Sequence, residues 1–167
     1  MARVLFVKAL TQAQAQAGNY KKKHIRWNGL EISIENAKGS VRRGKGPGGK
    51  EWKTTMVNDY GYIRRTLGVD GDHVDCYIGP DKDSVRVYVV HQRKAGDWKK
   101  FDEDKCMLGF ESKEAAKEAY LKHYDDPRFL GPITDMSVDE FKDKVRKTFD
   151  KPRMIKALFL SWPVQIC

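Results

Sequence analysis

DYGYIRR at residues 59–65 and DGDHVD at residues 70–75 are the two stretches that decide the fold of this chain. The first has the composition of a strand, and the second gathers three carboxylates within six residues. Crowded anions repel one another unless a cation lies between them, and carboxylate oxygens suit Mg²⁺, Mn²⁺ or Ca²⁺. Beside Arg64 and Arg65, the cluster predicts a metal site that handles a phosphorylated substrate. A solvated turn is the alternative, because Asp-Gly is a common turn dipeptide.

The spacing of the three aspartates sets what they can bind. Asp70 and Asp72 are two residues apart, so both side chains face the same way on an extended segment. Asp75 comes three residues later and reaches the same place only if the loop bends. In that geometry the three aspartates can bridge metal ions. Cys76 follows directly, but neighbouring carboxylates raise the pKa of a thiol, so we expect no nucleophile there.

Strand patterns come before helix patterns along the chain. Alternating or β-branched runs predict strands at residues 30–35, 52–56, 60–65, 74–78, 85–91 and 105–110. Glycines predict a turn at residues 44–49. Ser112 is a candidate N-cap for a helix at 113–124, and Ser137 and Glu140 have capping-box spacing before a helix that reaches Phe149. Pro152 is expected to open a last helix, through Leu160. This order predicts an α+β fold, with a mostly antiparallel sheet or small β-barrel flanked by C-terminal helices.

The positive charge is concentrated in the first part of the chain. The formal net charge is +9, and residues 1–65 carry 14 Lys and Arg against 4 Asp and Glu, whereas residues 66–167 carry 18 against 19. Such asymmetry indicates a polyanionic substrate or partner, including nucleic acid bound through the basic N-terminal half. A solubilising surface is the alternative.

The length suits one domain with a real core. We expect a lead-in at residues 1–19, the domain at 20–150, and a helix or tail at 151–167 that packs on the domain or on a partner. Three cysteines without CxxC spacing favour a reducing compartment over a zinc or disulfide framework. No apolar run is long enough to span a membrane, and residues 1–7 are too short for a signal peptide. We therefore expect a soluble cytoplasmic protein that contacts no membrane.

The stretch at residues 59–75 resembles the signature of soluble family I inorganic pyrophosphatases, in which a YGYI-type strand leads through a short loop to D-G-D-P-x-D. A wider resemblance, over residues 20–150, is to pyrophosphatase-like domains encoded by tailed phages and prophages. It includes ISIENAKGSVRR at 32–43, residues 89–92 and FDEDKCMLGF at 101–110. The resemblance implies a small, OB-like β-barrel and Mg²⁺-dependent hydrolysis of pyrophosphate, with Mn²⁺ as a second metal. For a phage protein it also implies the host-cell cytoplasm or the virion as location.

The resemblance assigns site residues position by position. Asp70, Asp72 and Asp75 match the metal-binding aspartates, and Asp72 is expected to orient or deprotonate the attacking water. Tyr60 matches the tyrosine that contacts phosphate. The remaining matches are metal ligands at Glu35, Asp102, Glu103 and Asp104, the catalytic Lys105, and substrate-binding groups at Arg43, Lys53 and Tyr124. His73 stands where the signature has Pro, so it leaves the loop intact, adds a ligand or alters activity.

Several alternatives stay open beside a pyrophosphate or nucleotide-derived phosphoanhydride substrate. One is a non-catalytic virion-associated or host-interaction protein, as a homo-oligomer or with a virion partner. Another is a metal-dependent nuclease, because Glu103 and Lys105 have E-x-K spacing and Asp75 would be its upstream acid. A phosphate-binding P-loop at residues 44–50 is disfavoured, because Glu51 stands where Ser or Thr is needed, and a basic hairpin tip near an anion is preferred. His91, at a strand end, is either structural or a site residue.

Overall fold

The computed structural model of the protein describes residues 4–5 and 22–156. The strands are β1 (Val4–Leu5), β2 (Lys23–Trp27), β3 (Leu30–Asn36), β4 (Val41–Lys45), β5 (Glu51–Thr55), β6 (Asp59–Ile63), β7 (Val74–Ile78), β8 (Arg86–Lys94), β9 (Asp97–Leu108) and β10 (Ile133–Ser137). The helices are α2 (Lys113–Leu121) and α3 (Val138–Lys147), with short 3₁₀ turns at Pro47–Gly49 and Pro127–Phe129. None of the helices in these residues is both long and apolar enough to cross a membrane.

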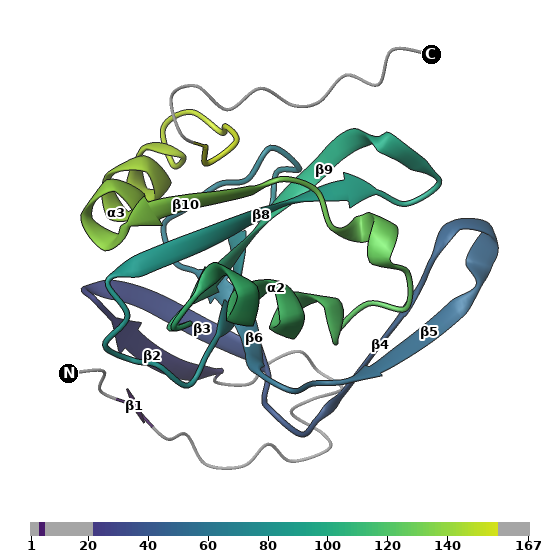
Figure 1. Ribbon diagram of the computed structural model, residues 1–167, viewed down its shortest axis with the longest axis horizontal. Coiled ribbons are helices and arrows are strands. Elements are labelled where there is room, and N and C mark those ends of the chain that lie inside the picture. The colour runs from purple at the N-terminus through teal and green to yellow at the C-terminus, as the bar shows by residue number, and fades with distance from the viewer. Residues whose placement is uncertain (1–3, 6–21, 157–167) are drawn as a thin grey trace.

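Within the described residues, one curled sheet has the strand order β1-β2-β3-β6-β7-β9-β8-β10 (Figure 1). Every neighbouring pair in it is antiparallel except β7 and β9, which run parallel with Asp75 opposite Lys105. The expectation of an α+β, mostly antiparallel and OB-like fold is confirmed. The strands predicted at 30–35, 60–65 and 74–78 are β3, β6 and β7 within two residues.

The sheet has a separate hydrophobic core on each face, because side chains alternate along a strand. Val87 and Val89 of β8 point into a core that α3 closes with Phe141 and Val145. Tyr88 and Val90 point to the opposite face, where α2 contributes Ala116 and Tyr120. Each helix thus covers one face of the same sheet. Tyr60 and Tyr77 belong to the α2 face, so the candidate site described below lies there.

The predicted helix starts are confirmed. Ser112 Oγ accepts a hydrogen bond from the Ala115 N–H at 3.1 Å, and Ser137 Oγ accepts one from the Glu140 N–H at 3.2 Å. The first helix ends at Leu121 rather than at 124. There the His123 ring turns back to the Ala119 carbonyl at 2.7 Å and also accepts the Val57 N–H at 3.2 Å. This tertiary contact outweighs the helix propensity of the residues that follow.

The Gly-rich turn joins a hairpin, as expected. Strands β4 and β5 pair only with each other among the described residues, and Figure 1 shows the hairpin projecting beside the main sheet. Exposed and half-buried residues alternate along both strands. Gly48 and Gly49 have φ of 74° and 76°, which suits glycine at the tip. The hairpin therefore presents one face to the body and one to solvent.

Two expectations for the C-terminal part are wrong. Strand β10 was not anticipated, and β9 starts at Asp97, eight residues before the expected start. Residues 152–156 are not helical. Instead Ile155 is buried, and its N–H donates to Asp104 Oδ2 at 2.7 Å. A partner across the sheet has replaced the local hydrogen bonds that a helix would form. The rest of the expected helix, residues 157–160, lies outside the described residues, as does the lead-in apart from β1.

Candidate active site

A buried lysine lies at the centre of a hydrogen-bonded network formed by β6, β7 and β9. Lys105 Nζ lies 2.6 Å from Asp75 Oδ2, 2.8 Å from Glu103 Oε1 and 2.9 Å from Tyr60 Oη. The Tyr60 hydroxyl also donates to Asp75 Oδ2 at 2.5 Å. The strand register explains the arrangement, because Asp75 and Lys105 are direct partners in the parallel pair. Four residues that the sequence assigned to the site are thereby brought together.

The charges in this network are coupled. Burial alone would lower the pKa of Lys105, but Tyr124, Tyr60 and the carboxylates of Asp75 and Glu103 outweigh it and raise that pKa well above its ordinary value. Burial raises the pKa of Glu103 to about 7, against the opposing charge of Lys105 and with a further increase from Asp75. One ammonium group serves two carboxylates, so the second carboxylate is only partly compensated. Burial also raises the pKa of Tyr60, which stays a neutral donor.

Arg42 completes the cationic side of the site and was missed in the sequence. Its guanidinium lies 4.4 Å from the Tyr60 ring centroid and 5.4 Å from that of Trp52. The sequence analysis assigned substrate binding to Arg43, but Arg43 pairs with Lys53 on the solvent side of the hairpin. Strand alternation places consecutive arginines on opposite faces. Which of the two faces the body depends on tertiary packing of the hairpin.

A cavity of about 640 Å³ opens beside the network, between the β4–β5 hairpin, the β8–β9 end and the segment after α2. Lys105, Glu103 and Arg42 line it together with Tyr124, which was expected to bind substrate. Lys53 borders this cavity and also a hollow of about 470 Å³ that Arg43 lines on the hairpin. The network is therefore accessible to a ligand from one side, and Arg43 is outside that opening.

The acidic loop holds its own shape through local hydrogen bonds. Asp70 Oδ1 accepts the Asp72 N–H at 3.1 Å, and Gly71 has φ of 88°. His73 stacks on Tyr62 at a centroid distance of 4.5 Å, and its Nδ1 lies 3.2 Å from the Thr66 carbonyl oxygen. The unexpected histidine thus braces the loop against β6. Asp70 and Asp72 remain exposed, and Asp70 and Glu103 border one small void.

A β-bulge lies among the acidic residues of β9. Gln92 is opposite Glu103 while Arg93 is opposite Phe101, so Asp102 is the extra residue. As a result Asp102 and Glu103 both accept hydrogen bonds from Gln92 Nε2, at 3.1 and 3.4 Å. The bulge keeps these two carboxylates on the same side as the network.

Asp104, which was expected to be a metal ligand, has its carboxylate on the face opposite Glu103 and Lys105. Its Oδ1 lies 2.6 Å from His91 Nδ1, and its Oδ2 accepts the Ile155 N–H. His91 Nε2 lies 2.7 Å from Thr134 Oγ1, and the His91 side chain is fully buried. Both ring nitrogens of His91 and both carboxylate oxygens of Asp104 have partners inside the protein. These contacts favour the structural alternative for His91.

Glu35 lies at another bulge, between Ile34 and Asn36 of β3. Its carboxylate is exposed and pairs with Lys22 at 2.9 Å. Lys22 Nζ in turn lies 4.7 Å from the Tyr62 ring centroid. Through Tyr62, Glu35 is connected to His73 and the acidic loop rather than to Lys105.

The donor chemistry suits a hard divalent cation. Asp70 and Asp72 form no ion pair with any lysine, arginine or histidine in the part of the chain that the structure describes. Carboxylates without a cationic partner are the kind of ligand that Mg²⁺ prefers. Among residues 4–5 and 22–156, however, no three His, Cys, Asp or Glu side chains lie close enough to hold an ion together. The carboxylates form two groups, one on the loop and one around Lys105.

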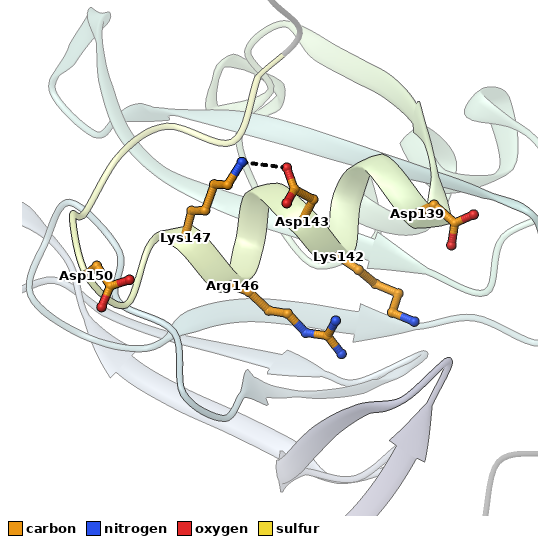
Figure 2. Close-up of a pocket in the computed structure, with 6 residues that line it drawn as sticks. All are labelled: Asp139, Lys142, Asp143, Arg146, Lys147 and Asp150. Carbon is orange, nitrogen blue, oxygen red and sulfur yellow. Dashed lines mark hydrogen bonds and ion pairs between the residues drawn. The ribbon is translucent and has the colours of Figure 1, made fainter.

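A further hollow lies on α3, away from this network. Figure 2 shows its lining, in which acidic and basic side chains are interspersed along α3 and just after it, and Lys147 pairs with Asp143 at 2.8 Å. The residues are Asp139, Lys142, Asp143, Arg146, Lys147 and Asp150. Their charges balance, as on the solvated face of a helix. We assign no chemistry to this hollow.

The curled sheet brings Lys105, Tyr60 and Asp75 into one hydrogen-bonded network, and Lys105 also lines the neighbouring cavity. The family described as Inorganic Pyrophosphatase matches residues 12–146, and the chain belongs to this family. The inorganic pyrophosphatase of Corynebacterium glutamicum is 33% identical over 93 residues, which are 54% of this chain and 52% of that protein. The chain thus spans about half the length of this curated relative. The solved structure of an inorganic pyrophosphatase from Neisseria gonorrhoeae is 16% identical, with a TM-score of 0.43, over 72% of this chain and 90% of that one.

Proposed function

We propose that this protein hydrolyses a phosphoanhydride, inorganic pyrophosphate in the first place, with Mg²⁺ or Mn²⁺ as the metal. The observation that carries the proposal is the buried Tyr60–Asp75–Lys105–Glu103 network at the wall of the large cavity. Lys105 and Arg42 supply positive charge where the product phosphate develops negative charge, and Tyr60 supplies a neutral hydroxyl. Membership of the inorganic pyrophosphatase family supports the same reaction.

The metal would be held by the carboxylates on the site's side of the sheet and loop: Asp70, Asp72, Asp75, Asp102 and Glu103, with Glu35 at the edge. Bound Mg²⁺ neutralises substrate charge and lowers the pKa of water. Water adds to one phosphorus, the bridging P–O bond breaks, and the two protons of the water end on the two phosphates. Asp72 is the proposed acceptor of the first proton, because it is exposed and unpaired. Glu103, with a pKa of about 7, can hold a proton near neutral pH.

The test is phosphate release from pyrophosphate by the purified protein in Mg²⁺. Asp72→Asn is expected to lower kcat by about 100-fold or more, the lower range for removing a general base, without changing the melting temperature. Asp83→Asn is the matched control, because Asp83 is also an exposed aspartate on a loop but lies outside the acidic loop at residues 70–75. Equal turnover in both variants would remove Asp72 from the mechanism.

A nuclease is the second candidate, and one observation favours it. Asp75, Glu103 and Lys105, the three residues of an acid plus E-x-K site, are brought within one network. The basic hairpin beside it could hold a nucleic-acid backbone. Incubation with single- and double-stranded DNA in Mg²⁺ separates the two functions, because only a nuclease shortens the strands.

A non-catalytic role in a virion or at a host protein, as expected for a phage-encoded member, is the third candidate. It is motivated by His73 in the signature and by the carboxylates that remain in two groups. Metal binding by calorimetry without release of phosphate or cleavage of DNA would favour it over both enzymatic functions.

A further inference from the structure

The cavity is larger and more aromatic than a pyrophosphate ion requires. Its volume of about 640 Å³ falls among pockets of about 300–1,000 Å³ that enclose drug-sized ligands. Aromatic rings gain little against a small, strongly hydrated anion. The rings that line it are Trp52, Tyr77, Trp98, Tyr124 and Phe129. The volume and the lining fit a molecule with a phosphorylated end and a planar organic end.

Trp52 is the ring best placed to receive a planar group. It is opposite Gly44 in the hairpin, and a Cβ added at Gly44 would lie 2.3 Å from Trp52 Cζ2. Glycine at this position therefore lets the indole lie across the strand backbone. Among the described residues, Trp98, on the other side of the opening, has more ring neighbours than Trp52. The Arg128 guanidinium lies 4.6 Å from the Trp98 centroid and Phe129 packs edge-on at 4.9 Å, whereas the Arg42 guanidinium lies 5.4 Å from the Trp52 centroid.

Arg42 connects the Trp52 ring with the Lys105 network. Its guanidinium lies 4.4 Å from the Tyr60 centroid and 5.4 Å from the Trp52 centroid. Tyr60 in turn hydrogen-bonds to Lys105 at 2.9 Å. A ligand whose phosphates contact Arg42 and Lys105 consequently has Trp52 within reach of a group attached to those phosphates.

We propose that the cavity binds a nucleoside polyphosphate, with the base stacked on Trp52 and the phosphoanhydride at Arg42 and Lys105. The inference rests on the proposed function and extends its substrate class. Water adds to the terminal phosphorus of a nucleoside triphosphate, and the bridging P–O bond breaks. The nucleoside diphosphate leaves, one proton of the water stays on the phosphate, and the other passes to the buffer.

The test compares ATP and pyrophosphate as substrates of wild type, Trp52→Ala and Trp52→Phe. Base stacking is worth about 1–3 kcal/mol, so Trp52→Ala should raise KM for ATP by about tenfold. The kcat/KM for pyrophosphate should change by less than about twofold, and Trp52→Phe should restore much of the ATP affinity because it keeps a ring. Thr55→Ala is the control, since Thr55 is on the same strand, faces solvent and lies outside the cavity.

Calorimetry with the non-hydrolysable imido analogue of ATP separates this inference from the proposed function. Analogue binding that weakens about tenfold in Trp52→Ala supports the nucleotide site even if wild type hydrolyses neither substrate, in which case the proposed function fails alone. Pyrophosphate hydrolysis without hydrolysis or binding of the nucleotide would overturn the inference and leave the proposed function intact. If Trp52→Ala lost activity toward ATP and toward pyrophosphate equally, Trp52 would only support the hairpin. That result would also overturn the inference.

Discussion

Lys105 carries a single positive charge between two carboxylates, Asp75 at 2.6 Å and Glu103 at 2.8 Å. A buried ammonium is costly unless it is paired, and here its pairing leaves one carboxylate in excess. The excess appears at Glu103, whose pKa burial raises to about 7. At neutral pH this residue is partly protonated and so can act as either donor or acceptor.

Glu103 should make stability depend on pH. Its folded-state pKa is above the ordinary value of 4.5, so the folded protein binds this proton more tightly than the unfolded chain does. That stabilisation is complete below pH 4.5 and is lost as pH rises through about 7. In metal-free buffer, the melting temperature of Glu103→Gln should therefore fall less between pH 5 and pH 8 than the melting temperature of wild type does. Glu118→Gln, an exposed acid on α2, is the control, and parallel curves for all three proteins would contradict the assignment.

At the scale of elements, the His73 side chain braces the acidic loop. His73 joins the loop to β6 through the Tyr62 ring and to the Thr66 carbonyl. We expect His73→Ala to raise the Mg²⁺ concentration for half-maximal activity several-fold, because metal binding must then supply the entropy cost of ordering the loop. The kcat at saturating Mg²⁺ should stay nearly unchanged. His73→Phe keeps the stacking on Tyr62, so its Mg²⁺ requirement should lie between those of wild type and His73→Ala. A fall in kcat with no shift in Mg²⁺ dependence would contradict a bracing role.

The C-terminal segment is attached to the sheet through a second buried charge. Asp104 serves both His91 and the Ile155 N–H, so Asp104→Ala leaves two buried groups without partners. Breaking a buried pair in this way costs about 3–5 kcal/mol, which urea unfolding would measure. Asp135→Ala is the matched control, because its pair with Arg86 is 44% exposed on both sides and such surface pairs contribute about 0–1 kcal/mol. Similar losses in both variants would argue against a special role for Asp104.

On the scale of the whole molecule, local patterns predicted the fold better than the site. Strand alternation and capping serines located β3, β7 and the helix starts, because these signals are contained in adjacent residues. The choice of Arg42 over Arg43, and the turning of Asp104 away from Glu103, depend on how the hairpin and the two cores pack. Strand β10 was missed because its pairing with β8 is long-range. The cavity of about 640 Å³ likewise arises only where distant elements meet.

The parallel pairing of β7 with β9 has a consequence for how the protein folds. The chain that connects β7 to its parallel partner β9 includes all of β8, whereas β8 and β9 are consecutive antiparallel strands. Contacts between distant residues form late because they require closure of a long loop, so we expect the β8–β9 ladder to form before Asp75 meets Lys105. Native secondary structure should therefore return before Asp75 and Lys105 come together. In refolding from urea, recovery of the far-ultraviolet circular dichroism signal should precede recovery of pyrophosphate hydrolysis. Simultaneous recovery would mean that the parallel pair forms with the first structure, so enzymatic activity would report the earliest folding step instead of the last.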